Sequence, residues 1–371
     1  MTPIAMLRDR AGRILLLASL LVLPLAGSGP VISQELPDEV ERPMDAELVD
    51  QARLAIHRGL QYLKASQNAN GSWTDKIGRK VHYNYDAIEG QHVGVTALAC
   101  TAFIAGGSLP GVGEYGEQVE RGLQYVVRNV GENGFITANG SRMYSHAFAT
   151  LFLAEVYGMT GMSEVRAALK RSVGLIVQAQ NEQGGWRYQP GANDADMSIT
   201  VCQVMALRAA NNSGIHVPKG TIDNAIRYVR NSYDPTYDGF SYQADDGRSR
   251  GRSRTTFSLT AAGVTALYGA GVYDDPMITD GLVYLMENRP SRYEAESTFD
   301  YYYGMYYATQ AAFQRGGEYW YRWHRSVWRD VIALQNRGQG SWRDLVGPNY
   351  ATAMACIIMQ IPYQYLPIFE R

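Results

Sequence analysis

Residues 180–214 read QNEQGGWRYQPGANDADMSITVCQVMALRAANNSG and join a glycine turn, an acidic loop and an apolar segment. The turn returns as QNANGSW at residues 67–73 and, one residue longer, as QNRGQGSW at residues 335–342. Weaker copies without the tryptophan stand at residues 133–135 and 238–240. A motif that returns every few tens of residues indicates a repeat architecture, so we expect one supersecondary unit copied along the chain.

The residues of the turn suit the end of a helix. The glutamine amide can donate to the carbonyls that a helix end leaves unpaired. Glycine supplies positive φ, and the ring of Trp186 can lie over the turn and pin it to its neighbour. The motif resembles the QxxxGxW repeat of the squalene cyclase and prenyltransferase superfamily. The resemblance covers nearly all of the chain after residue 48, and it implies a fold more specifically than a chemistry.

Six amphipathic segments alternate with six segments that are apolar nearly all round. We expect the amphipathic helices to lie outside and the apolar helices to be buried. The expected fold is all-α, an α/α toroid of about six helical hairpins around a central cavity, with little or no sheet. An open solenoid is the alternative, but its apolar inner faces would be exposed. The apolar segments are residues 93–106, 146–158, 197–210, 255–271, 302–313 and 350–360.

The N-terminus carries a targeting pattern. Arg8, Arg10 and Arg13 precede an apolar run at residues 14–27, which is typical of a signal peptide. We therefore expect a signal peptide at 1–28, a linker at 29–48 and the toroid at 49–371, with export to the periplasm or the extracellular space. An uncleaved membrane anchor is the alternative. The net charge of −2 gives no reason to expect a nucleic-acid partner, and a membrane is expected only through the signal segment.

The apolar segments align on a shared threonine, and polar residues precede four of these threonines by one helical turn. We expect these residues to cluster at one mouth of the cavity, where inner-helix N-termini point their amide dipoles. His92, His146 and Thr256 are accordingly expected to bind a ligand. The trio of His92, His146 and Asp196 also has the side-chain types of a metal site, whereas the alternative is that each residue caps its own helix. The threonines are Thr96, Thr150, Thr200, Thr260, Thr309 and Thr352.

The loop before the third apolar segment contains Asp194-Ala195-Asp196-Met197. It resembles the DxDD acid motif of class II terpene cyclases, in which clustered carboxyls protonate an alkene. The resemblance implies that Asp196 is the proton donor and Asp194 its partner. The motif's last aspartate is Met197 here, and N-capping of the helix is the alternative role for Asp196.

Residues 299–303 resemble the DxYH segment of the protein prenyltransferases, with Tyr303 at the histidine position. The family's other zinc-ligand positions fall on Arg254 and Thr256, so no zinc and no other cofactor is expected. Asp300 and Tyr303 are instead expected to line the cavity as ligand-binding residues. A neighbouring basic loop could hold a diphosphate or be a solvated surface loop. Its arginines are Arg248, Arg250, Arg252 and Arg254.

The favoured function is an exported toroid that binds an apolar, isoprenoid-like or other small-molecule or lipid ligand in its cavity without turnover. One alternative is a terpene cyclase-like isomerase that uses Asp194 and Asp196. The other is a glycan-active toroid, in which paired carboxylates such as Asp196 and Asp300 would serve.

Overall fold

Twelve α-helices account for most of the residues that a computed structural model of the chain describes, namely 44–81, 84–244, 254–290 and 300–369. The expected signal peptide, the linker up to residue 43 and Arg248, Arg250 and Arg252 lie outside these residues. Residues 37–371 form one compact structural unit. No helix among the described residues is both long enough and apolar enough to cross a membrane.

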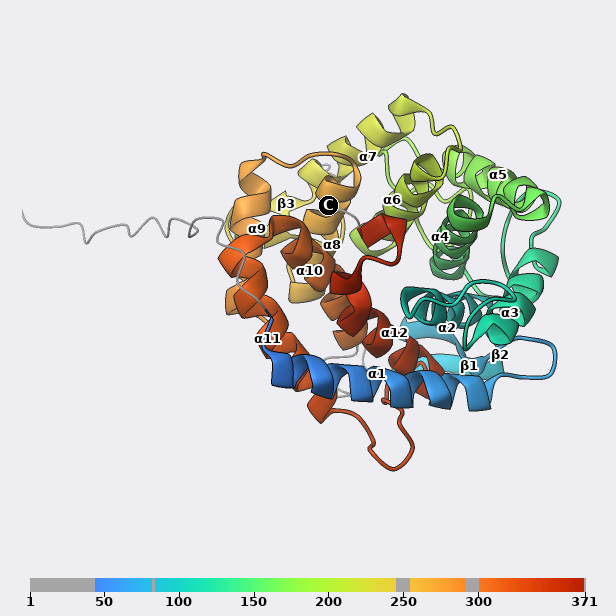
Figure 1. The fold of residues 1–371 in the computed structure, drawn as a ribbon. Helices are drawn as coiled ribbons and strands as arrows, with labels where there is room; N and C mark the ends of the chain where they lie inside the picture. Colours follow the sequence, from blue (N-terminus) through green and yellow to red (C-terminus); the bar gives the residue numbers. More distant parts are fainter. Residues whose placement is uncertain (1–43, 82–83, 245–253, 291–299, 370–371) are drawn as a thin grey trace, which may run out of the picture. The chain divides into compact units, whose positions relative to one another are not determined.

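The helices of this unit form two concentric rings (Figure 1). Each inner helix packs on the next, and the last packs on the first, so the inner ring is closed. This arrangement confirms the expected all-α toroid of six hairpins. The inner helices are α2 (Val93–Ala105), α4 (Met143–Thr160), α6 (Met197–Asn212), α8 (Phe257–Gly269), α10 (Tyr301–Arg315) and α12 (Pro348–Gln360). The outer helices are α1 (Ala46–Ser66), α3 (Gly116–Arg128), α5 (Ser163–Gln178), α7 (Lys219–Asn231), α9 (Pro276–Glu287) and α11 (Gly317–Ala333).

The distribution of apolar residues explains which helices lie inside. Every residue of α2 is buried, which suits a helix that is covered on all sides. In α3 the buried residues Val119, Leu123 and Val126 form one stripe, and charged residues occupy the other face. The inner helices therefore build the core, while each outer helix contributes one face to it.

Copies of the repeated turn join α1 to α2, α5 to α6 and α11 to α12. Trp73, Trp186 and Trp342 are almost completely buried, as expected for clamping rings. The indole N–H of Trp186 donates to the carbonyl of Ile176 in the last turn of α5, at 2.7 Å. The tryptophan, not the glutamine, thus pairs with the helix-end carbonyl. The amide of Gln180 donates instead to Gly184 and to Thr221 of the next outer helix, both at 2.8 Å.

The shared threonines explain how the turns dock on the inner ring. The hydroxyl of Thr200 accepts a hydrogen bond from the backbone N–H of Trp186 at 3.2 Å and donates to the carbonyl of Asp196 at 2.8 Å. Equivalent bonds join Trp73 to Thr96 and Trp342 to Thr352, both at 3.1 Å. The threonine alignment found in the sequence is therefore a structural feature of the repeat.

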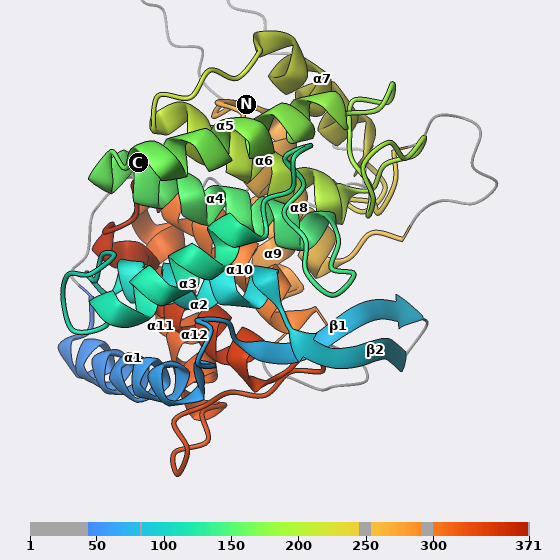
Figure 2. The ribbon, with the colours of Figure 1, turned by 90° about the vertical axis from the view of Figure 1, so that its right-hand side faces the viewer.

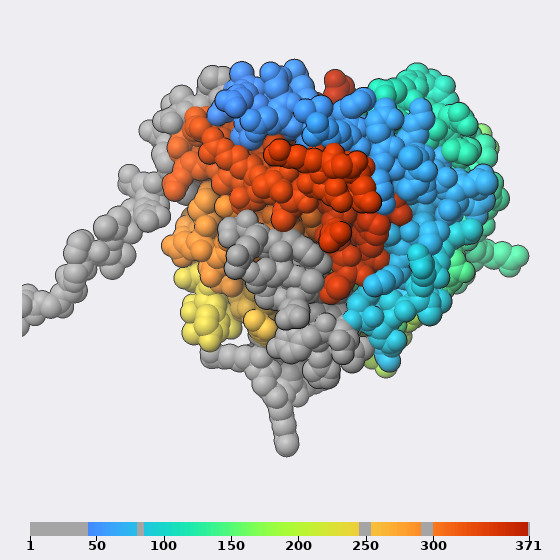
Figure 3. Space-filling model, turned by 90° about the horizontal axis from the view of Figure 1, so that it is seen from below, coloured from blue at the N-terminus to red at the C-terminus, as the bar shows by residue number. Residues whose placement is uncertain are grey.

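The first and last helices close the outer ring. Figure 3 shows α1 lying along α11, which is far from it in sequence. The amide of Gln335, at the turn after α11, donates to the carbonyl of Ala55 in α1 at 2.9 Å. Gly59 allows α1 to approach α12 closely, since a Cβ atom there would lie 2.6 Å from the sulfur of Cys356. The repeat motif itself therefore joins the ends of the toroid.

Two features were not expected from the sequence. Strands β1 (Thr74–Val81) and β2 (Asn84–Gln91) form an antiparallel hairpin with Ile77 opposite Ile88 (Figure 2). Of these two paired isoleucines, Ile77 is buried and Ile88 is exposed, so only part of this face of the hairpin packs on the core. The short strands β3 (Tyr233–Asp234) and β4 (Gly239–Phe240) form a second pair.

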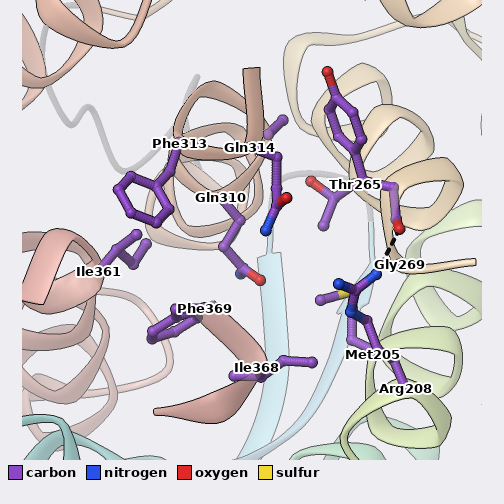
Figure 4. Close-up of a pocket in the computed structure, with 12 residues that line it drawn as sticks. Met205, Arg208, Thr265, Gly269, Gln310, Phe313, Gln314, Ile361, Ile368 and Phe369 are labelled. Carbon is purple, nitrogen blue, oxygen red and sulfur yellow. Dashed lines mark hydrogen bonds between the residues drawn. The ribbon is translucent and has the colours of Figure 1, made fainter. Parts of the chain in front are cut away.

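The C-terminal tail contains the 3-10 helices η1 (Ile361–Tyr363) and η2 (Pro367–Phe369) and lies over one end of the inner ring. Ile368 and Phe369 face the C-terminal ends of α6, α8 and α10 (Figure 4). Between tail and ring lies a pocket with about 330 Å³ of empty space, part of which is open to solvent. Arg208 lines this pocket, and its guanidinium donates a hydrogen bond to the carbonyl of Tyr268 at 2.8 Å. The tail thus occupies the C-terminal end, and the residues singled out from the sequence lie at the N-terminal end.

Candidate functional site at the N-terminal mouth

Asp196 is a fully buried carboxylate at the start of α6. Its Oδ1 accepts hydrogen bonds from the backbone N–H of Ile199 at 2.9 Å and from the hydroxyl of Ser198 at 2.5 Å. Its Oδ2 accepts from the hydroxyl of Tyr242 at 3.3 Å. Burial raises the pKa of Asp196, and these hydrogen bonds act in the opposite direction. The residue caps α6, and its carboxyl group lies among polar side chains at the N-terminal end of this inner helix.

Arg187 lies between the two aspartates of the DxDD-like loop. Its guanidinium is 3.2 Å from Asp194 and 3.6 Å from Asp196, and its carbon lies 5.1 Å from the ring centre of Tyr188 and 5.5 Å from that of Tyr242. Asp194 is 54% exposed, whereas Asp196 is buried. The two carboxylates are therefore linked through a cation. Sequence reasoning missed Arg187, although it directly follows the tryptophan of the turn.

Four tyrosines surround Asp196, and all four are half-buried. Tyr303 of α10 donates to the carbonyl of Ser198 at 2.7 Å, and Tyr144 of α4 shares a hydrogen bond of 2.5 Å with the Ser198 hydroxyl. The hydroxyls of Tyr188 and Tyr242 lie 2.6 Å apart. Burial raises the pKa of Tyr144 and Tyr303 well above the ordinary value, so the phenols stay protonated. Tyr303, which was expected to bind a ligand, thus lies beside Asp196.

A second group of acids lies near the start of α12. Asp75 of β1 is 4% exposed and accepts a hydrogen bond from the backbone N–H of Tyr350 at 2.7 Å. Asp344 accepts from the N–H of Val346 at 2.8 Å. Burial raises the pKa of each of these two aspartates to about 7, and the charge of Asp300 further raises that of Asp344. Neither Asp75 nor Asp344 was singled out from the sequence, although each stands two residues after the tryptophan of a repeated turn.

The expected ligand-binding residues His92 and Thr256 act as helix caps. The Nδ1 of His92 accepts from the N–H of Val95 at 3.3 Å, and the hydroxyl of Thr256 accepts from Leu259 at 3.3 Å. Burial lowers the pKa of His92 to about 4. Asp300 is exposed before α10 and makes no capping bond.

His146 does not lie at the rim. It is fully buried in the first turns of α4, and its Nδ1 accepts from the backbone N–H of Ile136 at 3.1 Å. Its ring centre lies 5.6 Å from that of Phe135. It therefore holds the weak repeat turn of residues 133–135, much as the threonines hold the other turns. In the described part of the chain, no three His, Cys, Asp or Glu side chains form a group that could hold a metal ion.

Comparison with known proteins agrees with this architecture. Residues 144–309 match the squalene-hopene cyclase C-terminal domain. No curated protein matches the chain. The match and the fold together support a terpenoid cyclase-like α/α toroid, the superfamily that the repeated turns resemble.

Solved toroids with quite different activities share the fold. A variant of a type II terpene cyclase from Scytonema, in complex with geranylgeranyl dihydroxybenzoate, is 14% identical with a TM-score of 0.57 and covers 87% of this chain and 99% of its own. An inactive α-1,6-mannanase variant of Salegentibacter sp., with α-1,6-mannotriose, is 9% identical with a TM-score of 0.59, and the coverage is 84% and 98%. Cellobiose 2-epimerase from Bacillus thermoamylovorans is 14% identical with a TM-score of 0.64, covering 85% and 99%. At these identities the likeness shows the fold alone.

Proposed function

We propose that this terpenoid cyclase-like toroid binds a small-molecule ligand at its N-terminal mouth and does not transform it. The observation that carries the proposal is the ring of half-buried phenols around Asp196 and Arg187. Aromatic faces bind apolar or carbohydrate surfaces, while their hydroxyls and the guanidinium provide polar anchors. Solved toroids of the same fold are in complex with an isoprenoid conjugate in one case and an oligosaccharide in another, which supports ligand binding by a toroid of this fold.

The surroundings of Asp196 favour binding over proton donation. An acid that protonates an alkene must aim an O–H bond at its substrate. Both oxygens of Asp196 already accept hydrogen bonds, and Arg187 stabilises the ionised form. The cation between Asp194 and Asp196 also removes the direct carboxyl contact that a proton-sharing pair needs.

The test has two arms. The first is native mass spectrometry and lipid extraction of protein purified from its host, followed by calorimetric titration with any ligand found. Replacing Tyr144 and Tyr303 together by alanine should weaken that affinity at least tenfold, whereas Lys170→Ala on the exposed face of α5 should not. The second arm is incubation with squalene and with polysaccharides. A new product from either would replace binding by catalysis, and an unchanged affinity in the double variant would move the site elsewhere.

We also propose that the protein is exported, on the basis of the basic and apolar N-terminal pattern alone. N-terminal sequencing of the protein from its native host should find a mature chain that begins near Gly29. An intact Met1 on protein in the cytoplasm would contradict export and would leave the proposed ligand site unaffected.

A further inference from the structure

The segment that leads into α12 is fixed to strand β1 by several hydrogen bonds. The backbone N–H of Lys76 donates to the carbonyl of Val346 at 2.9 Å, and the amide of Asn349 donates to the carbonyl of Thr74 at 2.9 Å. Ser66 in turn donates to the Asn349 side chain at 2.7 Å. Asp344 therefore stands in a loop whose position is set on both sides.

One oxygen of Asp344 is not used by the fold. Its Oδ1 accepts the N–H of Val346, but its Oδ2 is buried and has no hydrogen-bond partner among the described residues. A buried carboxylate oxygen without a donor is costly, because its desolvation is not offset by a hydrogen bond. By comparison, both oxygens of Asp75 accept hydrogen bonds, one from the side chain of Asn349 and the other from the backbone N–H of Tyr350. The Oδ2 of Asp344 is thus an unused acceptor in an otherwise satisfied segment.

The neighbours of Asp344 place it at the mouth. It is close enough to Asp300 at the start of α10, Tyr85 of β2 and Tyr350 of α12 for their charges to interact. Burial is the main cause of the raised pKa values of Tyr85 and Tyr350, and the charge of Asp344 raises both further. Tyr350 also lies within the charge range of Cys202 on α6, inside the inner ring. The unused acceptor therefore lies at the same N-terminal end of the inner ring as Asp196, next to α12, which stands opposite α6 in the ring.

We propose that the Oδ2 of Asp344 accepts a hydroxyl group of a carbohydrate ligand, whose apolar face lies on the tyrosines of the mouth. This inference rests on the proposed function and names its ligand class. A hydrocarbon would leave the Oδ2 of Asp344 without a donor, which is unfavourable. A sugar offers both a hydroxyl donor for Asp344 and a C–H face for an aromatic ring. Asp75, Asp300, Tyr85 and Tyr350 lie within charge range of Asp344, and Arg142 lies within charge range of Tyr85.

The experiment compares sugars with an isoprenoid on the full chain. Saturation-transfer NMR and calorimetry are carried out with α-1,6-mannotriose, cellobiose and geranylgeraniol. We expect at least one sugar to bind, Asp344→Ala to weaken it about tenfold or more, and Asp344→Asn to weaken it less. Glu164→Gln, an exposed residue on α5, should change nothing. Circular dichroism and thermal melting establish that each variant is folded, and Asp344→Asn, which keeps the shape of the side chain, serves if the alanine variant does not fold.

The possible results separate this inference from the proposed function. Binding of geranylgeraniol alone, with equal affinity in the Asp344 variants, would overturn the carbohydrate assignment and leave ligand binding at the mouth in place. A sugar that binds equally to wild type and to both Asp344 variants would overturn the subsite. Binding of none of the three probes would count against the carbohydrate inference, while the host-extract experiment would still decide the proposed function.

Discussion

The carboxylate of Asp75 accepts a hydrogen bond from the backbone N–H of Tyr350 at 2.7 Å, across 275 residues of sequence. This bond caps α12 from outside, because its own N-cap residue is Gly347, which has no side chain to offer. A Cβ atom at Gly347 would lie 2.1 Å from the carboxylate of Asp75. The hairpin that carries Asp75 and the last inner helix are therefore one structural element of the mouth.

The pKa of Asp75 predicts how stability changes with pH. Burial raises it from 3.8 to about 7, so the folded state holds a proton that the unfolded chain has released. This contribution is complete below about pH 4 and is lost as pH rises through 7. The free energy of unfolding of Asp75→Asn relative to wild type should therefore increase between pH 4 and 8, by up to about 4 kcal/mol. Urea denaturation at each pH measures it. Asp50→Asn, with its exposed side chain, is the control, and a difference that stays constant with pH would contradict the prediction.

The buried tryptophan clamps should each be important for stability. Trp186→Ala removes a fully buried ring and leaves the carbonyl of Ile176 without its donor. We expect a loss of about 3–5 kcal/mol in the free energy of unfolding. Tyr237→Ala, at a 59% exposed residue, should stay within about 0.5 kcal/mol of wild type. A loss below about 1 kcal/mol for Trp186→Ala would mean that the ring does not clamp the turn.

Gln335 should hold the ends of the toroid together. Its amide donates to the carbonyl of Gly340 and to that of Ala55 in α1, both at 2.9 Å. Gln335→Ala removes one donor from each carbonyl, so we expect a loss of about 1–3 kcal/mol. Hydrogen exchange should show faster opening of α1 and α11 than of α4 and α5. The matched control is Gln124→Ala on the exposed face of α3, and equal exchange rates in all helices would refute a role in ring closure.

His146 should remain neutral over a wide pH range. Burial lowers its pKa to about 3, and its Nδ1 accepts the N–H of Ile136, so the proton lies on Nε2. Nitrogen-15 NMR of the imidazole should show this single tautomer down to about pH 4, and the urea-unfolded chain is the reference. Protonation of the folded protein near pH 6 would contradict the burial and the turn-holding role.

The local pattern of the chain was enough to predict the architecture. The apolar segment expected at residues 93–106 is the helix Val93–Ala105, and the repeated tryptophans are buried as their motif predicted. The partners of Gln180 were different from expectation, because its amide reaches an outer helix that only the folded repeat brings near.

Much of the mouth could not be predicted in this way. Asp194 and Asp196 were identified from their motif, and Tyr303 from its position in an aromatic segment. Arg187 and Asp344 follow the tryptophans of two turns closely, but the side chains that they meet come from other repeats and are known only from the fold. The β1–β2 hairpin was missed because its strands lack a regular alternation of apolar and polar residues.

The measurement that tests ligand binding at the N-terminal mouth most directly is a crystal structure of the protein with its ligand bound, after purification from the native host or soaking with a probe that binds in solution. We expect ligand density in contact with Tyr144 and Tyr303 and within hydrogen-bond distance of Asp344. Density confined to the C-terminal pocket beside Phe369, with the tyrosines of the mouth free of ligand, would contradict it.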